Sequence, residues 1–216
     1  MNAQYTAFDP DHKPSWSARA EELPYVPISD VTWMEACSFC RWLAVSFPWA
    51  RGARLPTEEE WEYACRAGTH GRYWNGNDAI ALDAVGWYDH NSFHGLHRVG
   101  EKLANPWGLY DTHGNVWEWT LSLWTDSYAG RENGVTLDPA AVEVPADESP
   151  DGTGYVMRGG CYWGDADWAR AAYRVVWNPA FKQEVRGFRI VLPAAHELSI
   201  LARSSITESL STRQSR

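Results

Sequence analysis

The sequence has few cysteines and no long apolar run. Four cysteines in 216 residues are too few to be the main covalent support of the fold. The opening stretch, MNAQYTAFDP, has neither the basic nor the apolar part of an export signal, so we expect the cysteines to be free thiols. No apolar stretch approaches the roughly 18 uninterrupted residues that a membrane helix needs. These features predict a soluble, cytoplasmic protein with no membrane partner.

Positive charge is also scarce. Lys and Arg number 19 against 28 Asp and Glu, which gives a formal net charge of -9. A protein that binds nucleic acid electrostatically needs a basic face to neutralise phosphates, and no run of Lys or Arg suggests one. We therefore expect no nucleic-acid partner.

Aromatic residues are abundant, with 14 Trp and 10 Tyr beside 17 Gly and 12 Pro. Tryptophan buries a large area and carries one N–H that requires a partner. This composition favours either a core crossed by polar contacts or an aromatic-lined binding surface, in a domain with much irregular backbone.

Two helices are predicted from their N-terminal caps. Thr32 and Glu35 have the spacing of a capping box, and an apolar stripe at helical spacing follows them. Thr57 and Glu60 repeat the pattern, with three carboxylates in the first turn where the helix dipole favours them. Gly68 is a natural stop for this second helix.

The rest of the chain reads as ordered loops with short strands. Residues 69–108 show no sustained period, whereas 116–120, 155–157 and 187–192 read as strands. An acidic excursion over 130–154 is too polar for a core. We predict one globular domain over 1–193, followed by a polar tail over 194–216.

Two groups of potential metal ligands have structural alternatives. Cys37 and Cys40 form a CxxC pair on the apolar stripe of the first helix, where buried thiols are favoured over a zinc or redox site. His90, His94 and His97 would gather a transition metal only if a turn folded them together, and a hydrogen-bonded loop is favoured.

Cys161 follows two glycines and precedes several aromatic residues. A thiol in this position is a candidate nucleophile or redox centre, although a packed thiol is at least as well supported because no neighbouring base is identifiable. Asp165 and Asp167 are candidates for acid–base chemistry or for solvated loop charges.

Asp111 and Glu118 lie seven positions apart around a Gly-Asn turn. Carboxylates combined with inward-turned carbonyls form an oxygen-ligand set suited to Ca²⁺. The alternative is a turn whose carboxylates bond nearby amides.

Several ordered motifs resemble the formylglycine-generating enzyme (sulfatase-modifying factor) family. They span residues 2 to about 192: Asn2-Ala3-Gln4-Tyr5, Val31-Thr32-Trp33, Arg54-Leu55-Pro56-Thr57-Glu58, Asn105-Pro106-Trp107-Gly108-Leu109-Tyr110-Asp111, Gly114-Asn115-Val116-Trp117-Glu118-Trp119, Arg158-Gly159-Gly160 and Gly187-Phe188-Arg189. The resemblance implies an α+β, C-type-lectin-like fold with little regular secondary structure. It also implies that the chain starts inside the family's first strand.

The resemblance bears on metals in two ways. The two copper-binding cysteines of the family's oxidases align with Gly164 and Ala169, and Cys161 alone cannot supply the two thiolates that Cu(I) prefers, so copper is not expected. One family calcium site aligns with the side chains of Asp111 and Glu118 and the carbonyls of Gly114 and Val116. We therefore predict one structural Ca²⁺.

A second branch of the fold family, the variable proteins of diversity-generating retroelements, carries its ligand contacts between Arg-Gly-Gly and Gly-Phe-Arg. The corresponding segment here is rich in Tyr and Trp, which suit recognition. About half of these rings are expected to belong to the core. The predicted ligand-binding residues are Tyr162, Trp163, Asp165, Asp167, Trp168, Tyr173, Trp177 and Phe181.

Together these observations predict a binding module for a protein or small-molecule ligand. One alternative is a metal-dependent oxidoreductase that acts on a thiol substrate through Cys161. Another is an accessory domain of a larger polypeptide or assembly.

Overall fold

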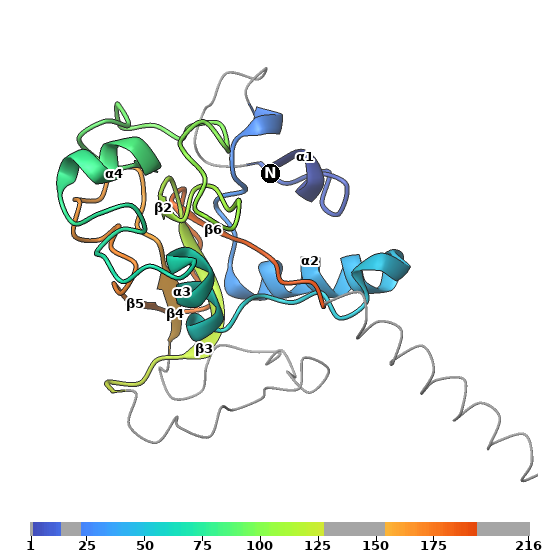
Figure 1. Cartoon of the computed structure of the whole chain (residues 1–216). Coiled ribbons are helices and arrows are strands. Elements are labelled where there is room, and N and C mark those ends of the chain that lie inside the picture. Colours follow the sequence, from blue (N-terminus) through green and yellow to red (C-terminus); the bar gives the residue numbers. More distant parts are fainter. Residues whose placement is uncertain (1, 14–22, 128–153, 194–216) are drawn as a thin grey trace, which may run out of the picture.

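The computed structural model describes residues 2–13, 23–127 and 154–193. The predicted polar tail and nearly all of the predicted acidic excursion lie outside these ranges. In Figure 1, α2 and α4 lie at opposite ends of the molecule with the strands between them. None of the helices in the described ranges is long and apolar enough to cross a membrane.

A four-stranded sheet forms the centre, with the strand order β5-β4-β3-β6. Its strands are β3 (Trp117–Leu123), β4 (Tyr155–Arg158), β5 (Val175–Trp177) and β6 (Arg186–Phe188). β3 pairs antiparallel with β4 and parallel with β6. A second, two-stranded parallel sheet joins β1 (Gly86–Trp87) to β2 (His113–Gly114). The three predicted strand regions are thus confirmed, with the last shortened to β6 and an isolated bridge at Val191.

Both capped helices are confirmed. They are α2 (Trp33–Ser46) and α3 (Glu58–Arg66), and each begins with the predicted capping box. At α2 the amide of Glu35 donates to Thr32 Oγ1 (3.1 Å), and the Thr32 amide donates to Glu35 Oε2 (2.7 Å). The last residue of α3, Arg66, is followed by Ala67 and by Gly68, the predicted stop, and both adopt the left-handed conformation with φ of 47° and 87°.

Two further helices differ from the sequence-based expectation. α4 (Ala79–Val85) lies in the stretch expected to be loops and strands, and Asp78 caps it by accepting from the amide of Ala81. The N-terminal element α1 (Asn2–Tyr5) is a helical turn where the end of a strand was expected. Short 3-10 turns cover Leu23–Tyr25 (η1) and Pro48–Ala50 (η2).

The main core lies between α2 and the sheet, and polar contacts cross it as the tryptophan content predicted. Trp33 and Trp119 are fully buried, and their indole N–H groups donate to the carbonyls of Thr120 (2.8 Å) and Val31 (3.0 Å). Cys37 and Cys40 are buried in this core as free thiols. Burial raises the pKa of Cys40 to about 12, which keeps it protonated.

Candidate functional site

Arginines anchor residues 161–181, here called the aromatic segment, from beneath. Arg174 donates to both carboxylate oxygens of Glu58 on α3, at 2.7 and 2.8 Å. Arg158, at the end of β4, has a fully buried side chain that is ion-paired with Glu62 of the same helix. It also donates to the carbonyls of Ala171, Ala172 and Tyr173 at 2.9, 3.3 and 3.0 Å. The backbone of the segment is therefore fixed by charge-assisted hydrogen bonds.

His113 forms a second anchor. Its Nε2 lies 3.1 Å from the amide nitrogen of Trp74, and its Nδ1 lies 2.7 Å from the carbonyl oxygen of Ala169. Because an amide only donates, Nε2 accepts, and the proton resides on Nδ1, which donates to Ala169. Burial lowers the pKa of His113 to about 4, so the ring is neutral at pH 7.

We expect His113 to make folding sensitive to acid. Its pKa is lowered in the folded protein, so the unfolded chain binds more protons between about pH 4 and 6.5. The contribution of His113 is complete above about pH 6.5 and decreases as the pH falls, by about 3 kcal/mol in total. Urea unfolding at pH 7.5, 6.0 and 5.0 measures this loss.

The matched variant is His113→Asn, which keeps a donor near Ala169 but does not titrate. Burial raises the pKa of the Asp111 carboxyl, so Asp111 changes the stability with pH in the opposite direction to His113. This contribution is present in both the wild type and the variant. The difference between wild type and variant therefore isolates His113. If the two free-energy profiles stay parallel from pH 7.5 to 5.0, His113 does not carry this sensitivity.

The predicted ligand-binding residues divide into exposed and packed groups. Trp163, Trp177 and Phe181 are exposed by 46%, 41% and 63%. Tyr162 is buried, so its ring does not line the surface expected for it. Trp168 and Tyr173 are half-buried, and their rings pack against the buried ring of Trp117, with centroids 6.1 and 5.9 Å away. Of the predicted aromatic residues, Tyr162 therefore belongs to the core, and Trp168 and Tyr173 belong to it in part.

The two aspartates of the segment differ in their partners. Asp167 is exposed and ion-paired with Arg72, with Arg170 3.9 Å away. Asp165 is exposed and accepts from the Trp168 amide at 3.1 Å. The structure gives Asp167 a role in holding the segment and leaves the carboxylate of Asp165 directed to the surface.

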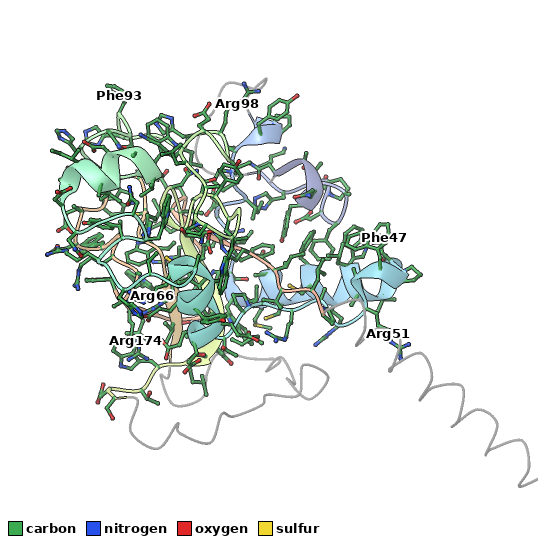
Figure 2. The ribbon with its side chains drawn as sticks, in the orientation of Figure 1. Phe47, Arg51, Arg66, Phe93, Arg98 and Arg174 are labelled. Atoms are coloured by element: carbon green, nitrogen blue, oxygen red, sulfur yellow. The ribbon has the colours of Figure 1, made fainter. Side chains whose placement is uncertain are left out.

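A second loop, which the sequence reasoning did not place here, lies against the aromatic segment. Ser92 Oγ donates to the carbonyl of Tyr162 (2.5 Å), and the amide of Asp89 donates to the carbonyl of Gly164 (3.0 Å). These two bonds flank Trp163. Figure 2 shows Phe93, from the same loop, projecting from the edge of the molecule. The only sign of this loop's role in the sequence is a large aromatic residue, Phe93, within a polar stretch.

The residues at the family's copper positions do not fit a copper site. Cys161 is 1% exposed, and burial raises the pKa of its thiol to about 12. A Cβ atom at Gly164 would lie 2.6 Å from Trp168 Cε3, so a cysteine there would have no room. Ala169 is buried against the second, smaller core cluster. The site offers one protonated thiol, whereas Cu(I) requires thiolate ligands.

The residues at the predicted calcium positions fit only in part. Asp111 favours a cation, since its Oδ1 is buried without a hydrogen-bond partner. The carboxylate of Glu118 is already engaged: it is ion-paired with Arg189 through both oxygens and accepts from Trp61 Nε1 at 2.5 Å. As arranged, the set of Asp111, Gly114, Val116 and Glu118 does not present two free carboxylates. The calcium site stays a prediction.

The other candidate ligands are dispersed. Across the described residues, no three His, Cys, Asp or Glu side chains are grouped to hold a metal ion. His97 stacks on Trp87 with ring centroids 3.6 Å apart and contacts the carbonyl of Ser92 (2.8 Å). His94 lies 3.5 Å from Asp89 on the exposed loop. His97 and His94 are therefore engaged in contacts within their own loop.

The chain has relatives among known proteins. The model of the sulfatase-modifying factor enzyme 1-like domain matches residues 4–194. The chain is 31% identical to the formylglycine-generating enzyme of Thermomonospora curvata over 187 residues, which cover 78% of this chain and 56% of that protein. It is 36% identical to mouse "inactive C-alpha-formylglycine-generating enzyme 2" over 109 residues, which cover 46% of this chain and 33% of that protein. The chain thus spans about a third to about half of the length of these relatives.

Among solved structures, variable protein 1 of Treponema denticola superposes with a TM-score of 0.71 at 26% identity, covering 90% of this chain and 82% of that one. This likeness confirms the predicted α+β, C-type-lectin-like fold with little regular secondary structure. With the family model matched over nearly the whole chain, the conclusion is that the chain belongs to the sulfatase-modifying factor (formylglycine-generating enzyme) family.

Proposed function

We propose that this chain is a protein-binding module of the family and that it lacks the oxidase chemistry. The observation that carries the proposal is a rigidly anchored segment with three exposed aromatic side chains, those of Trp163, Trp177 and Phe181. Tyr and Trp contribute much contact area at low entropy cost, and a pre-organised loop loses little further entropy on binding.

The anchoring supports recognition over a purely structural role. Arg174 is bonded to Glu58 within the fold, and Arg158 fixes three consecutive carbonyls of the segment. Such bonds hold the backbone while the rings of Trp163 and Phe181 stay exposed to a partner. The ring of Trp177 is partly covered by the guanidinium of Arg186, 3.9 Å from its centroid. Large rings left exposed on a fixed loop are typical of contact residues.

The copper positions support the absence of oxidase activity. Gly164 and Ala169 have no donor side chain, and the buried Cys161 thiol stays protonated at neutral pH. The name of the mouse relative records an inactive protein, and that of the Treponema structure records a variable protein. Both names are compatible with a scaffold that has kept its fold and changed its use.

A peptide-display selection tests the proposal. The wild-type chain is used to select binders from a random library of 12-residue peptides, and the Kd of each binder is then measured for variants. We expect Trp163→Ala and Phe181→Ala to weaken binding at least about tenfold, since truncating an aromatic anchor costs at least about 1.4 kcal/mol.

Phe47→Ala is the control, because Phe47 is exposed beyond the C-terminal end of α2, outside the aromatic segment and far from Phe93 (Figure 2). Thermal unfolding verifies that each variant is folded. The proposal fails if no selected peptide depends on Trp163 or Phe181. It also fails if the purified protein binds copper and converts the cysteine of a Cys-x-Pro-x-Arg peptide to formylglycine.

A further inference from the structure

Phe93 and His94 adopt an unusual backbone conformation. They have consecutive positive φ angles of 53° and 56°, in the left-handed region that bulky residues avoid. Phe93 is nevertheless 90% exposed, so burial of its ring does not compensate for the strain. Strained residues persist where the surrounding structure determines them and where function uses them.

The strain is maintained by hydrogen bonds that lead to the aromatic segment. The amide of His94 donates to Ser92 Oγ (3.1 Å), and the same hydroxyl donates to the carbonyl of Tyr162. Asn115 joins the two loops from below, accepting from the amide of His97 through Oδ1 (3.2 Å) and from the amide of Tyr162 through its carbonyl (2.9 Å). The loop that carries Phe93 is therefore tied to the backbone on both sides of the exposed Trp163.

Two carboxylates accompany these rings without a permanent counter-charge. Asp89 and Asp165 are exposed, and the segments that carry them are joined by the bond from the Asp89 amide to the Gly164 carbonyl. Within the described part of the chain, no Lys or Arg lies within 4.0 Å of either carboxylate, and Asp89 approaches only His94. The surface thus combines aromatic faces with uncompensated negative charge.

We propose that residues 89–94 and 162–165 form one recognition surface for a basic, Lys- or Arg-bearing segment of a protein partner. A cationic side chain over the ring of Trp163 or Phe93 gains a cation–π interaction, and the carboxylates neutralise its charge. The net charge of -9 also attracts such a segment over longer range. This inference rests on the proposed binding function and names the chemistry of its partner.

The peptides selected by display test this chemistry. We expect Lys and Arg to be enriched in the peptides that depend on Trp163. Their Kd values should rise with salt, because exposed charge pairs are screened. The double variant Asp89→Asn/Asp165→Asn should bind these peptides about tenfold more weakly. Asp11 is an exposed charge outside the two loops, so Asp11→Asn should leave the Kd unchanged.

Phe93→Gly separates a binding role from a structural one. Glycine accepts the left-handed conformation without strain, so we expect the unfolding midpoint to rise by about 2–4 °C. The same variant should bind the selected basic peptides about tenfold more weakly, whereas Phe47→Ala should bind as the wild type. If Phe93 served stability alone, Phe93→Gly would lower the unfolding midpoint and leave the peptide Kd unchanged.

The failure of this inference is distinguishable from that of the proposed function. The inference is wrong, and the proposed binding function stands, if the peptides that depend on Trp163 are not basic. The same holds if their Kd values are unchanged by Phe93→Gly and by the double Asp variant. If no peptide depends on Trp163 or Phe181, both are wrong.

Discussion

Replacing Arg158 with methionine is expected to lower the free energy of unfolding by about 3–5 kcal/mol, since it removes a buried cation that binds a carboxylate and three backbone carbonyls. The side chain of Arg158 is fully buried and binds Glu62. The substitution also removes the donors to the carbonyls of Ala171, Ala172 and Tyr173, at the centre of the aromatic segment. Urea unfolding at pH 7.5 measures the loss.

The matched control is Arg66→Met. Arg66 binds the same Glu62 carboxylate at 2.8 Å, but from a partly exposed position one helical turn away. A partly exposed pair of this kind, within one helix, contributes at most about 1 kcal/mol. Equal losses in the two variants would show that burial does not decide the contribution of Arg158.

Any folded fraction of Arg158→Met should also bind selected peptides more weakly, because the aromatic segment is less ordered in this variant.

Gly114→Ala is expected to destabilise the protein by about 3–5 kcal/mol, through overpacking and backbone strain together. Gly114 has a φ of 82°, and a Cβ atom there would lie 1.9 Å from the carbonyl oxygen of Trp87. That oxygen belongs to β1, which pairs with Gly114 in β2. Since backbone on both sides has no room to move, we expect the β1–β2 pair to open.

Gly108→Ala separates the cost of a steric clash from the cost of a left-handed backbone conformation. Gly108 has a φ of 78°, but nothing lies within 4 Å of the position that an alanine Cβ would take, so only the cost of a left-handed alanine, about 1 kcal/mol, applies. Thermal and urea unfolding of both variants give the comparison. A loss for Gly114→Ala no larger than that for Gly108→Ala would contradict the close packing of β1 against β2.

The sequence predicted local features better than long-range ones. The capping boxes of α2 and α3 depend on residues three positions apart, so their chemistry is visible in the sequence. α4 was missed because it is short and only Leu82 and Val85 of its residues are buried, which leaves little periodicity. The end of α3 at Gly68 was predicted, as the caps were, because a glycine in the left-handed conformation just after the last turn is a local signal.

The candidate site shows the same limit. The sequence shows which aromatic residues the segment contains, but the exposure of each ring depends on which rings the core accepts. Tyr162 packs inward and Trp163 outward, although they are neighbours. The contact between Ser92 and Tyr162 joins residues 70 positions apart, and nothing in either local sequence indicates it. The calcium-like spacing around Gly114 likewise does not indicate that the carboxylate of Glu118 is the partner of Arg189.

The charges of α3 have a consequence for how the chain is made. Glu58 and Glu62 reach partners 116 and 96 positions later in the sequence, so a ribosome completes this helix long before Arg158 and Arg174 emerge. Until Arg174 emerges, the carboxylate of Glu58 has to stay hydrated, because burying a charge without its cation is costly. Contacts of such high sequence separation slow folding. We therefore expect this helix to reach its final packing only after residue 174 has been translated.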